Sequence, residues 1–247
     1  MKTLKQHIFE KLKVSVRNTT KHTLFPKTKD ELKRMIEDEI SKNGNECSLN
    51  HIDVSKITDM AKLFYNSTFN GDISEWNVSN VTNMNGMFYT AKFDGDIFKW
   101  NVSNVKNMGF MFYRSNFNGD ISKWDVSKVN HMYGMFKESV FNGDISNWDV
   151  SSVENMGEMF SSSNFNGDIS SWNVSSVTNM HYMFFNSKFN GDISGWDVSN
   201  VKSMNCMFYA SKFNGDISMW DVSNVTNMTS MFTNSPLEKN PPVWYKS

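Results

Sequence analysis

Cysteine is scarce in this sequence, with only Cys47 and Cys206 among 247 residues. A secreted disulfide scaffold needs more cysteines at regular spacing, so the sequence predicts two free thiols. No apolar run approaches the roughly 18 residues that span a bilayer. Lysines interrupt the apolar residues of segment 1–14, so we expect no secretory signal and a cytoplasmic or particle-associated location.

Catalytic motifs are also missing. The five histidines show no ligand spacing, and the sequence contains no HExxH, GxSxG, phosphate loop or CxxC pair. A net charge of −1 gives no indication of nucleic-acid binding. We therefore expect a protein without enzymatic activity, without a resident cofactor and without a nucleic-acid partner.

A 24-residue repeat dominates what is present. The unit reads FNGDISxW(N/D)VSxVxNMxxMFxxSx, and its phenylalanine, glycine and aspartate keep one register from Phe69 to Asp216. The same register holds all tryptophans: Trp76, Trp100, Trp124, Trp148, Trp172, Trp196, Trp220 and Trp244. Only tandem repetition gives such regularity.

The repeat region has worn copies at both edges. A degenerate first copy begins near Leu49, and the last copy carries Leu237 in place of the phenylalanine. Terminal copies need such changes because no neighbour covers them. Residues 1–47 carry a net charge of +4, against −5 for the remainder. We therefore predict a basic, mainly helical head (1–47), a repeat region (48–235) and a degenerate C-terminal cap (236–247).

One copy, residues 69–92, predicts the local structure. Trp76 and Val78 alternate with polar residues, as in a short strand. Val81, Met84 and Phe88 recur at spacings of three and four, as in one or two helical turns. Stacked copies would bury their apolar columns, including fifteen of the 18 methionines. The predicted fold is a solenoid in which each coil has a short parallel strand and a short helical turn, either a short helix or a 3-10 turn. At a coil spacing of 4.8 Å it would be roughly 35–40 Å long.

The segment Gly215–Phe232, GDISMWDVSNVTNMTSMF, resembles the repeat of the BspA-like leucine-rich-repeat-type surface proteins of bacteria. The resemblance extends over residues 49–235. It implies a leucine-rich-repeat-like solenoid, and it implies adhesion or protein binding at a cell surface. Similar repeats occur in phage-encoded and other viral proteins. The chain departs from the family in lacking an export signal, and the family has no catalytic motif to transfer.

The head contains two predicted helices. Leu4, Ile8 and Leu12 suggest a short first helix among lysines. This helix could be an ordinary solvent-exposed helix, a partner-docking arm or a helix that lies on a membrane surface. Thr28-Lys29-Asp30-Glu31 is a capping box that starts a second helix, and Asn43-Gly44 stops it. We expect the second helix to cover the open end of the solenoid.

The Gly-Asp turn of each copy contributes one carboxylate to a column: Asp72, Asp96, Asp120, Asp144, Asp168, Asp192 and Asp216. Calcium is one interpretation, because hard cations take clustered carboxylates. The favoured interpretation is that each aspartate accepts backbone N–H bonds in its own turn, since calcium-binding repeats use a nine-residue period. The position after each tryptophan alternates between Asn and Asp, as a hydrogen-bond acceptor can but a metal ligand cannot.

Columns that vary among the copies are free to face solvent. Aromatic residues in these columns are candidate partner-binding residues: Tyr65, Tyr89, Tyr113, Phe110, Tyr133, Tyr182, Phe185 and Tyr209. Tyrosine is a frequent interface anchor; partial burial between coils is the alternative. Three functions remain open: a protein-binding or adhesion scaffold, a structural component of a phage, virus or other assembly docked through the head, and a calcium-dependent repeat protein.

Overall fold

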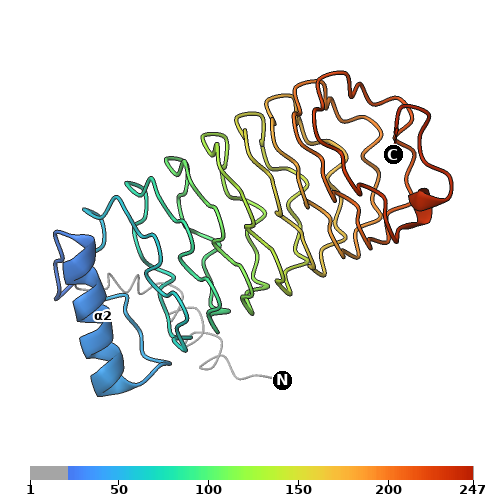
Figure 1. The fold of residues 1–247 in the computed structure, drawn as a ribbon. Helices are drawn as coiled ribbons and strands as arrows, with labels where there is room; N and C mark the ends of the chain where they lie inside the picture. The colour runs from blue at the N-terminus through green and yellow to red at the C-terminus, as the bar shows by residue number, and fades with distance from the viewer. Residues whose placement is uncertain (1–21, 247) are drawn as a thin grey trace, which may run out of the picture.

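The computed structural model describes residues 22–246. The 24-residue copies form successive turns of one coil, stacked side by side along a common axis (Figure 1). Helix α2 (Lys29–Asn43) lies at one end of the stack, and the 3-10 helix η1 (Pro236–Glu238) lies near the other. The first predicted helix lies outside the described residues. Assignment of this architecture to the leucine-rich-repeat-like solenoids stays a prediction.

Main-chain hydrogen bonds join neighbouring coils at a fixed offset. Isolated parallel bridges connect the residue before the first methionine of each copy to its equivalent in the next. Beyond this bridge, every second N–H donates to a carbonyl of the following coil, as Met60 does to Asn83 at 2.8 Å. The N–H groups in between donate three residues back, as Leu63 does to Met60 at 3.2 Å. Consecutive turns and an inter-coil ladder therefore share one backbone segment.

This pattern differs from the predicted short strand and helical turn of each copy. Within residues 22–246 the parallel pairing is limited to single-residue bridges, and the segment that holds Val81, Met84 and Phe88 consists of turns. An α-helix needs every N–H to donate four residues back. Here alternate N–H groups donate three residues back, as in a 3-10 turn, and the others donate to the next coil. Consecutive turns also place apolar residues three and four apart, which explains why the spacing resembled that of a helix.

Two positions in each of the eight copies have a positive φ between 49° and 60°. Glycine occupies only Gly86 and Gly134 among them. The other fourteen are Lys62, Asn66, Thr90, Phe110, Arg114, Glu138, Glu158, Ser162, Tyr182, Asn186, Cys206, Ala210, Ser230 and Asn234. The left-handed region costs a side-chain-bearing residue roughly 1–2 kcal/mol, so the inter-coil contacts must outweigh a strain that recurs in every coil.

The core is a continuous aromatic column. Phenylalanines of the Met-Phe pair stack from coil to coil with centroids 5.6 to 5.9 Å apart, beginning with Phe64 on Phe88. A second phenylalanine column, from Phe69 to Phe213, lies beside the first. Every tryptophan indole N–H donates to a carbonyl of the preceding copy at 2.9 to 3.2 Å, as Trp100 does to Ile73. The indoles thus connect coils by packing and by hydrogen bonding.

Helix α2 packs against the first coil. Thr28 is its N-cap, and the Thr28 hydroxyl accepts from the Glu31 N–H at 3.2 Å. The return bond of the predicted capping box is displaced by one residue, because the Glu31 carboxylate accepts from the Lys27 N–H at 2.7 Å. Leu32 and Ile36 are buried, and the first coil gains a cover for its apolar side.

We expect Trp100→Phe to destabilise the fold by about 2 kcal/mol, because it removes buried ring volume and leaves the Ile73 carbonyl without its donor. Guanidinium unfolding followed by circular dichroism measures the change. Trp244→Phe is the matched control: the indole of Trp244 makes the same bond to Ile217 but is only partly buried, so its loss should cost less. Equal losses of unfolding free energy in the two variants would show that complete burial of the indole adds nothing to stability.

We expect Thr90→Gly to be more stable than Thr68→Gly by about 1–2 kcal/mol. Both threonines are exposed, but only Thr90 has a positive φ, at 53°. Both substitutions add the same freedom to the unfolded chain, so their difference in unfolding free energy isolates the left-handed backbone strain. A difference near zero would mean that the turn carries no strain.

Candidate functional site

Three tyrosines of successive coils form a stacked row on the surface, which we call the tyrosine row: Tyr65, Tyr89 and Tyr113. Their centroids lie 4.6 and 4.4 Å apart, with interplanar angles of 18° and 28°. Tyr65 is 43% exposed, and the other two are half-buried. The repeat places them in one register because each comes directly after the core phenylalanine of the Met-Phe column. The row was predicted as a candidate contact surface, and the stacking leaves mainly ring edges and hydroxyls at the surface.

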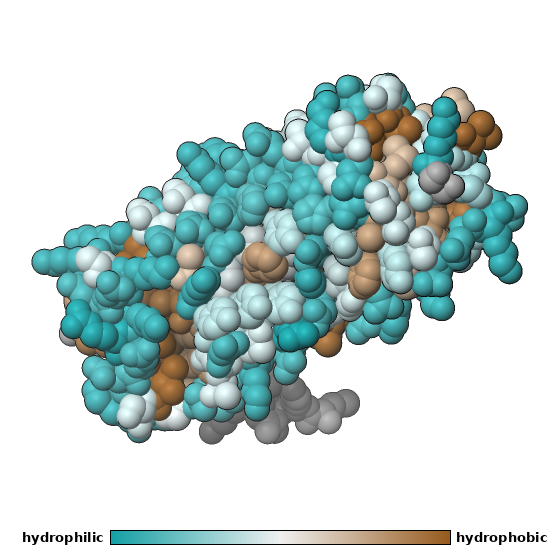
Figure 2. All heavy atoms as spheres, in the orientation of Figure 1, coloured by the Kyte–Doolittle hydropathy of each residue, from teal (hydrophilic) through white to brown (hydrophobic). Residues whose placement is uncertain are grey.

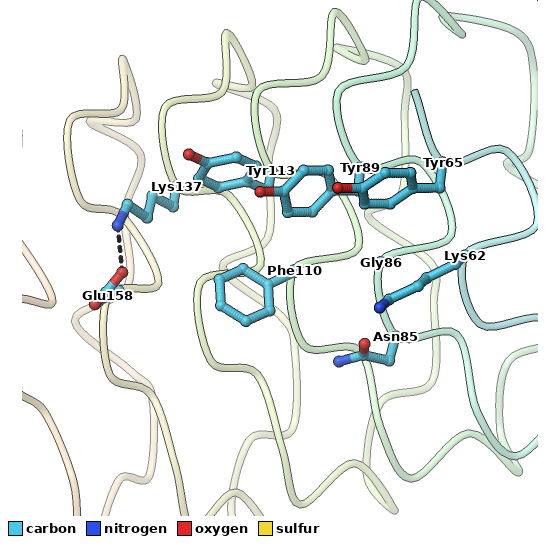
Figure 3. Close-up of a pocket in the computed structure, with 9 residues that line it drawn as sticks. All are labelled: Lys62, Tyr65, Asn85, Gly86, Tyr89, Phe110, Tyr113, Lys137 and Glu158. Atoms are coloured by element: carbon cyan, nitrogen blue, oxygen red, sulfur yellow. Dashed lines mark hydrogen bonds and ion pairs between the residues drawn. The ribbon is translucent and has the colours of Figure 1, made fainter. Parts of the chain in front are cut away.

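A groove with a volume of about 440 Å³ runs beside the tyrosine row (Figure 3). Besides the three tyrosines, its lining consists of Lys62, Asn85, Gly86, Phe110, Lys137 and Glu158. Phe110 contacts Tyr89 and Tyr113 edge to face at 6.2 and 6.0 Å. The groove thus combines an aromatic wall with polar groups drawn from successive coils.

Glycines create this hollow surface. In the positive-φ column, Gly86 lies between Lys62 and Phe110 and adds no side chain to the groove. Phe110 in turn lies over Gly134, where an added Cβ would approach its ring to 2.7 Å. Phe110 thus requires a glycine at the same position of the next coil, because its ring occupies the space above Gly134.

A polar cluster closes one end of the groove. Glu158 accepts from the Tyr133 hydroxyl and from the Lys137 amine, both at 2.5 Å. Burial opposes ionisation of Glu158, but the bonds from Lys137 and Tyr133 outweigh it and lower its pKa. Burial, together with Glu138, raises the pKa of Tyr113 to about 12. The lowered pKa keeps Glu158 ionised near neutral pH, and the raised pKa of Tyr113 and of Tyr133 keeps both phenols neutral.

The eight aromatic candidates form two groups. Tyr133 extends the first group, with its ring 4.9 Å from Phe110. Tyr182, Phe185 and Tyr209 form a second group further along the stack, with centroids 5.4 and 5.2 Å apart. Lys137 and the buried Ser161 occupy the equivalent positions between the groups. The aromatic column after the Met-Phe pair is therefore interrupted at these two positions, and His181 lies between the groups, with its ring 5.6 Å from Tyr133 and 5.8 Å from Tyr182.

Sequence reasoning missed the groove itself. Lys62, Asn85, Lys137 and Glu158 occupy variable columns in which nothing marks them as special. Their contacts join residues from different coils, such as the pair Tyr133–Glu158 at a separation of 25 residues. The one available signal was Gly86, a glycine in a column that carries large side chains in other copies.

Each aspartate of the Gly-Asp column makes a hydrogen bond within its own turn. In every copy the Asp side chain accepts the N–H of the residue two positions on, at 2.9 to 3.0 Å, as Asp120 does from Ser122. Residues 22–246 contain no group of three His, Cys, Asp or Glu side chains that could hold a metal ion. The Asn or Asp after each tryptophan also accepts from the serine two positions on, as predicted. Both cysteines are free.

We expect these turns to make stability fall in acid. Hydrogen bonds from the hydroxyl and N–H of the following serine lower the pKa of Asp125 and Asp197. A lowered folded-state pKa contributes stability above the unfolded pKa of about 3.9, and this stability is lost as pH falls through the folded-state value. Asn fills the same position in three copies, at Asn77, Asn101 and Asn173.

The double variant Asp125→Asn/Asp197→Asn should therefore match the original chain at pH 7 and lose less stability on acidification. Urea midpoints measured for both proteins from pH 7 down to about pH 2.5 test this expectation. Parallel curves for the two proteins would show that these carboxylates have the same pKa folded and unfolded.

Comparison with known proteins shows that one protein family matches this chain. The family described as "Mycoplasma protein of unknown function, DUF285" matches residues 30–142 and 137–244. No curated protein matches the chain, and no solved structure matches it. Neither α2 nor any other helix in residues 22–246 is both long and apolar enough to cross a membrane. The two matched regions together extend over most of the chain, which therefore belongs to the DUF285 family.

Proposed function

We propose that this protein is a non-catalytic protein-binding scaffold of the BspA-like, leucine-rich-repeat-like type, and that the tyrosine row and its groove contact the partner. The observation that carries the proposal is the groove of about 440 Å³ beside three stacked tyrosines. Tyrosines anchor protein interfaces because they offer large, rigid contact area with a polar tip.

The rigidity of the row supports this role. Each ring is fixed against its neighbours, so little conformational entropy is lost when a partner binds. The backbone beneath the row is held by the inter-coil ladder, with the Phe64 and Asn66 N–H groups bonded to the next coil at 2.9 and 2.8 Å. Pre-organised aromatic surfaces of this kind favour binding.

The charge states of the groove support binding over catalysis. A general acid or base needs a pKa near the working pH. The Tyr113 pKa of about 12 is far above that range, and Glu158 is committed to Lys137 and Tyr133. These residues suit a fixed recognition surface better than proton transfer.

Filling the groove tests the proposal. Random dodecapeptides displayed on phage would be selected on the full chain, and the affinity of the selected peptides compared between variants. Gly86→Tyr should weaken binding by about tenfold or more, as expected when a contact worth at least about 1.4 kcal/mol is lost. The fold should accept it, because Tyr182 has a φ of 55° in the same column, close to the 59° of Gly86.

Gly195→Tyr is the matched control. Gly195 lies in the column before the tryptophans, and an added Cβ there meets no atom within 4 Å. This variant should bind like the original chain. Peptides that bind Gly86→Tyr and the original chain equally would contradict a binding role for the groove.

A further inference from the structure

Lys62 is the uncompensated charge of the groove. Of the three charged residues in the lining, Lys137 and Glu158 form an ion pair whose side chains are mostly buried. The Lys62 amine has no hydrogen bond or ion pair with any residue in 22–246, and it lies 5.8 Å from the centre of the Tyr65 ring. Lys62 is exposed, and Figure 3 shows its amine directed over the groove beside Asn85. The groove therefore favours a negatively charged group at this end.

Three uncharged polar groups of the same lining also lack partners within the described part of the chain. These are the Asn85 carboxamide and the Tyr65 and Tyr89 hydroxyls. A carboxamide donates and accepts, and a phenol does the same. Together they match the alternating N–H and C=O groups of an extended polypeptide.

The ring faces of the tyrosine row are mostly covered by other side chains. Tyr89 is covered on both faces by its neighbours at 4.6 and 4.4 Å. Lys62 lies over the Tyr65 ring, and Arg114 and Lys137 lie 5.3 and 5.9 Å from the centre of the Tyr113 ring. Nucleobases need a free aromatic face on which to stack, and sugar rings packed against an aromatic platform need one too. The ring edges and hydroxyls that remain suit a peptide.

We infer that the groove binds a peptide segment that carries an acidic side chain, with its carboxylate paired to Lys62 and its backbone along Asn85 and the tyrosine hydroxyls. This inference rests on the proposed function and names the partner's chemistry. The carboxylate would pair with the amine where the amine lies over the Tyr65 ring, forming a charge-assisted hydrogen bond. Gly86 adds no side chain that would narrow the groove.

Charge reversal at Lys62 tests the inference in the same dodecapeptide selection. Peptides selected on the original chain should be enriched in Asp and Glu, and their affinity should fall as salt rises. Lys62→Glu should weaken these peptides by more than about tenfold, and a fresh selection on Lys62→Glu should return basic peptides. The fold has a precedent for this residue, because Glu158 has the same φ of 58° in the same column.

Lys202→Glu is the control for net charge, since Lys202 is exposed and lies several coils from the groove. It should leave the affinity of the acidic peptides unchanged. An equal loss in Lys202→Glu and Lys62→Glu would overturn the pairing, because it would reduce the effect to overall charge.

The outcomes separate this inference from the proposed function. Peptides that Gly86→Tyr abolishes but that are not acidic, or that ignore Lys62→Glu, overturn the inference and leave the proposed function standing. If no selected peptide depends on Gly86, both fail. Polygalacturonate, a carboxylated polysaccharide, serves as a second probe. If Gly86→Tyr abolishes binding of the polysaccharide while no peptide binds the groove, the ligand is a glycan and the inference is wrong.

Discussion

The contact between one coil and the next is the interaction on which this structure depends. A single coil has no continuous strand and no helix of its own, so it cannot close a core or satisfy its backbone alone. The indole of each copy supplies both needs at once, because its ring fills the core and its N–H reaches the preceding coil, as Trp100 does to Ile73. A buried aromatic side chain contributes up to about 3 kcal/mol, and here that contribution recurs at every interface. The left-handed residues of each coil are tolerated because this repeated contact holds them.

The register of the repeat was enough to predict the core, whereas the backbone shape of the turns was not predictable. Trp76 and Phe69 were correctly placed in the core, because apolar columns at a constant period must be buried together. The second helix of the head was correctly bounded, because Thr28 and Gly44 are strong local signals. The spacings of three and four predict a short helix or a 3-10 turn, and the structure has turns with hydrogen bonds three residues back. No residue type marks a positive φ at a position such as Thr90, so the left-handed columns could not be predicted.

The candidate site also has one part that could be predicted from the sequence and one part that could not. The tyrosine row could be found by counting, since residues in one column must become neighbours when copies stack. The groove depends on the difference between copies: Gly86 is bare where Phe110 is large, and Glu158 receives bonds from the coil before it. Figure 2 shows a mostly hydrophilic surface with apolar side chains gathered beside α2 and toward the C-terminal end. A binding surface in such a protein is formed by side chains that differ between copies and that the repeated backbone places next to one another.

The ladder between coils has a direction, and this direction makes the two ends of the stack chemically different. In the ladder segment, N–H groups point toward the following coil and carbonyls toward the preceding one, as between Met60 and Asn83. In this segment the last coil presents donors: the Met228 and Ser230 N–H groups have no acceptor in residues 22–246, while a carboxylate, that of Glu238, accepts from the Asn234 N–H. A chain of this kind can gain or lose whole copies internally and still continue its ladder and its core columns, but each end of the stack needs a cover suited to the groups it presents.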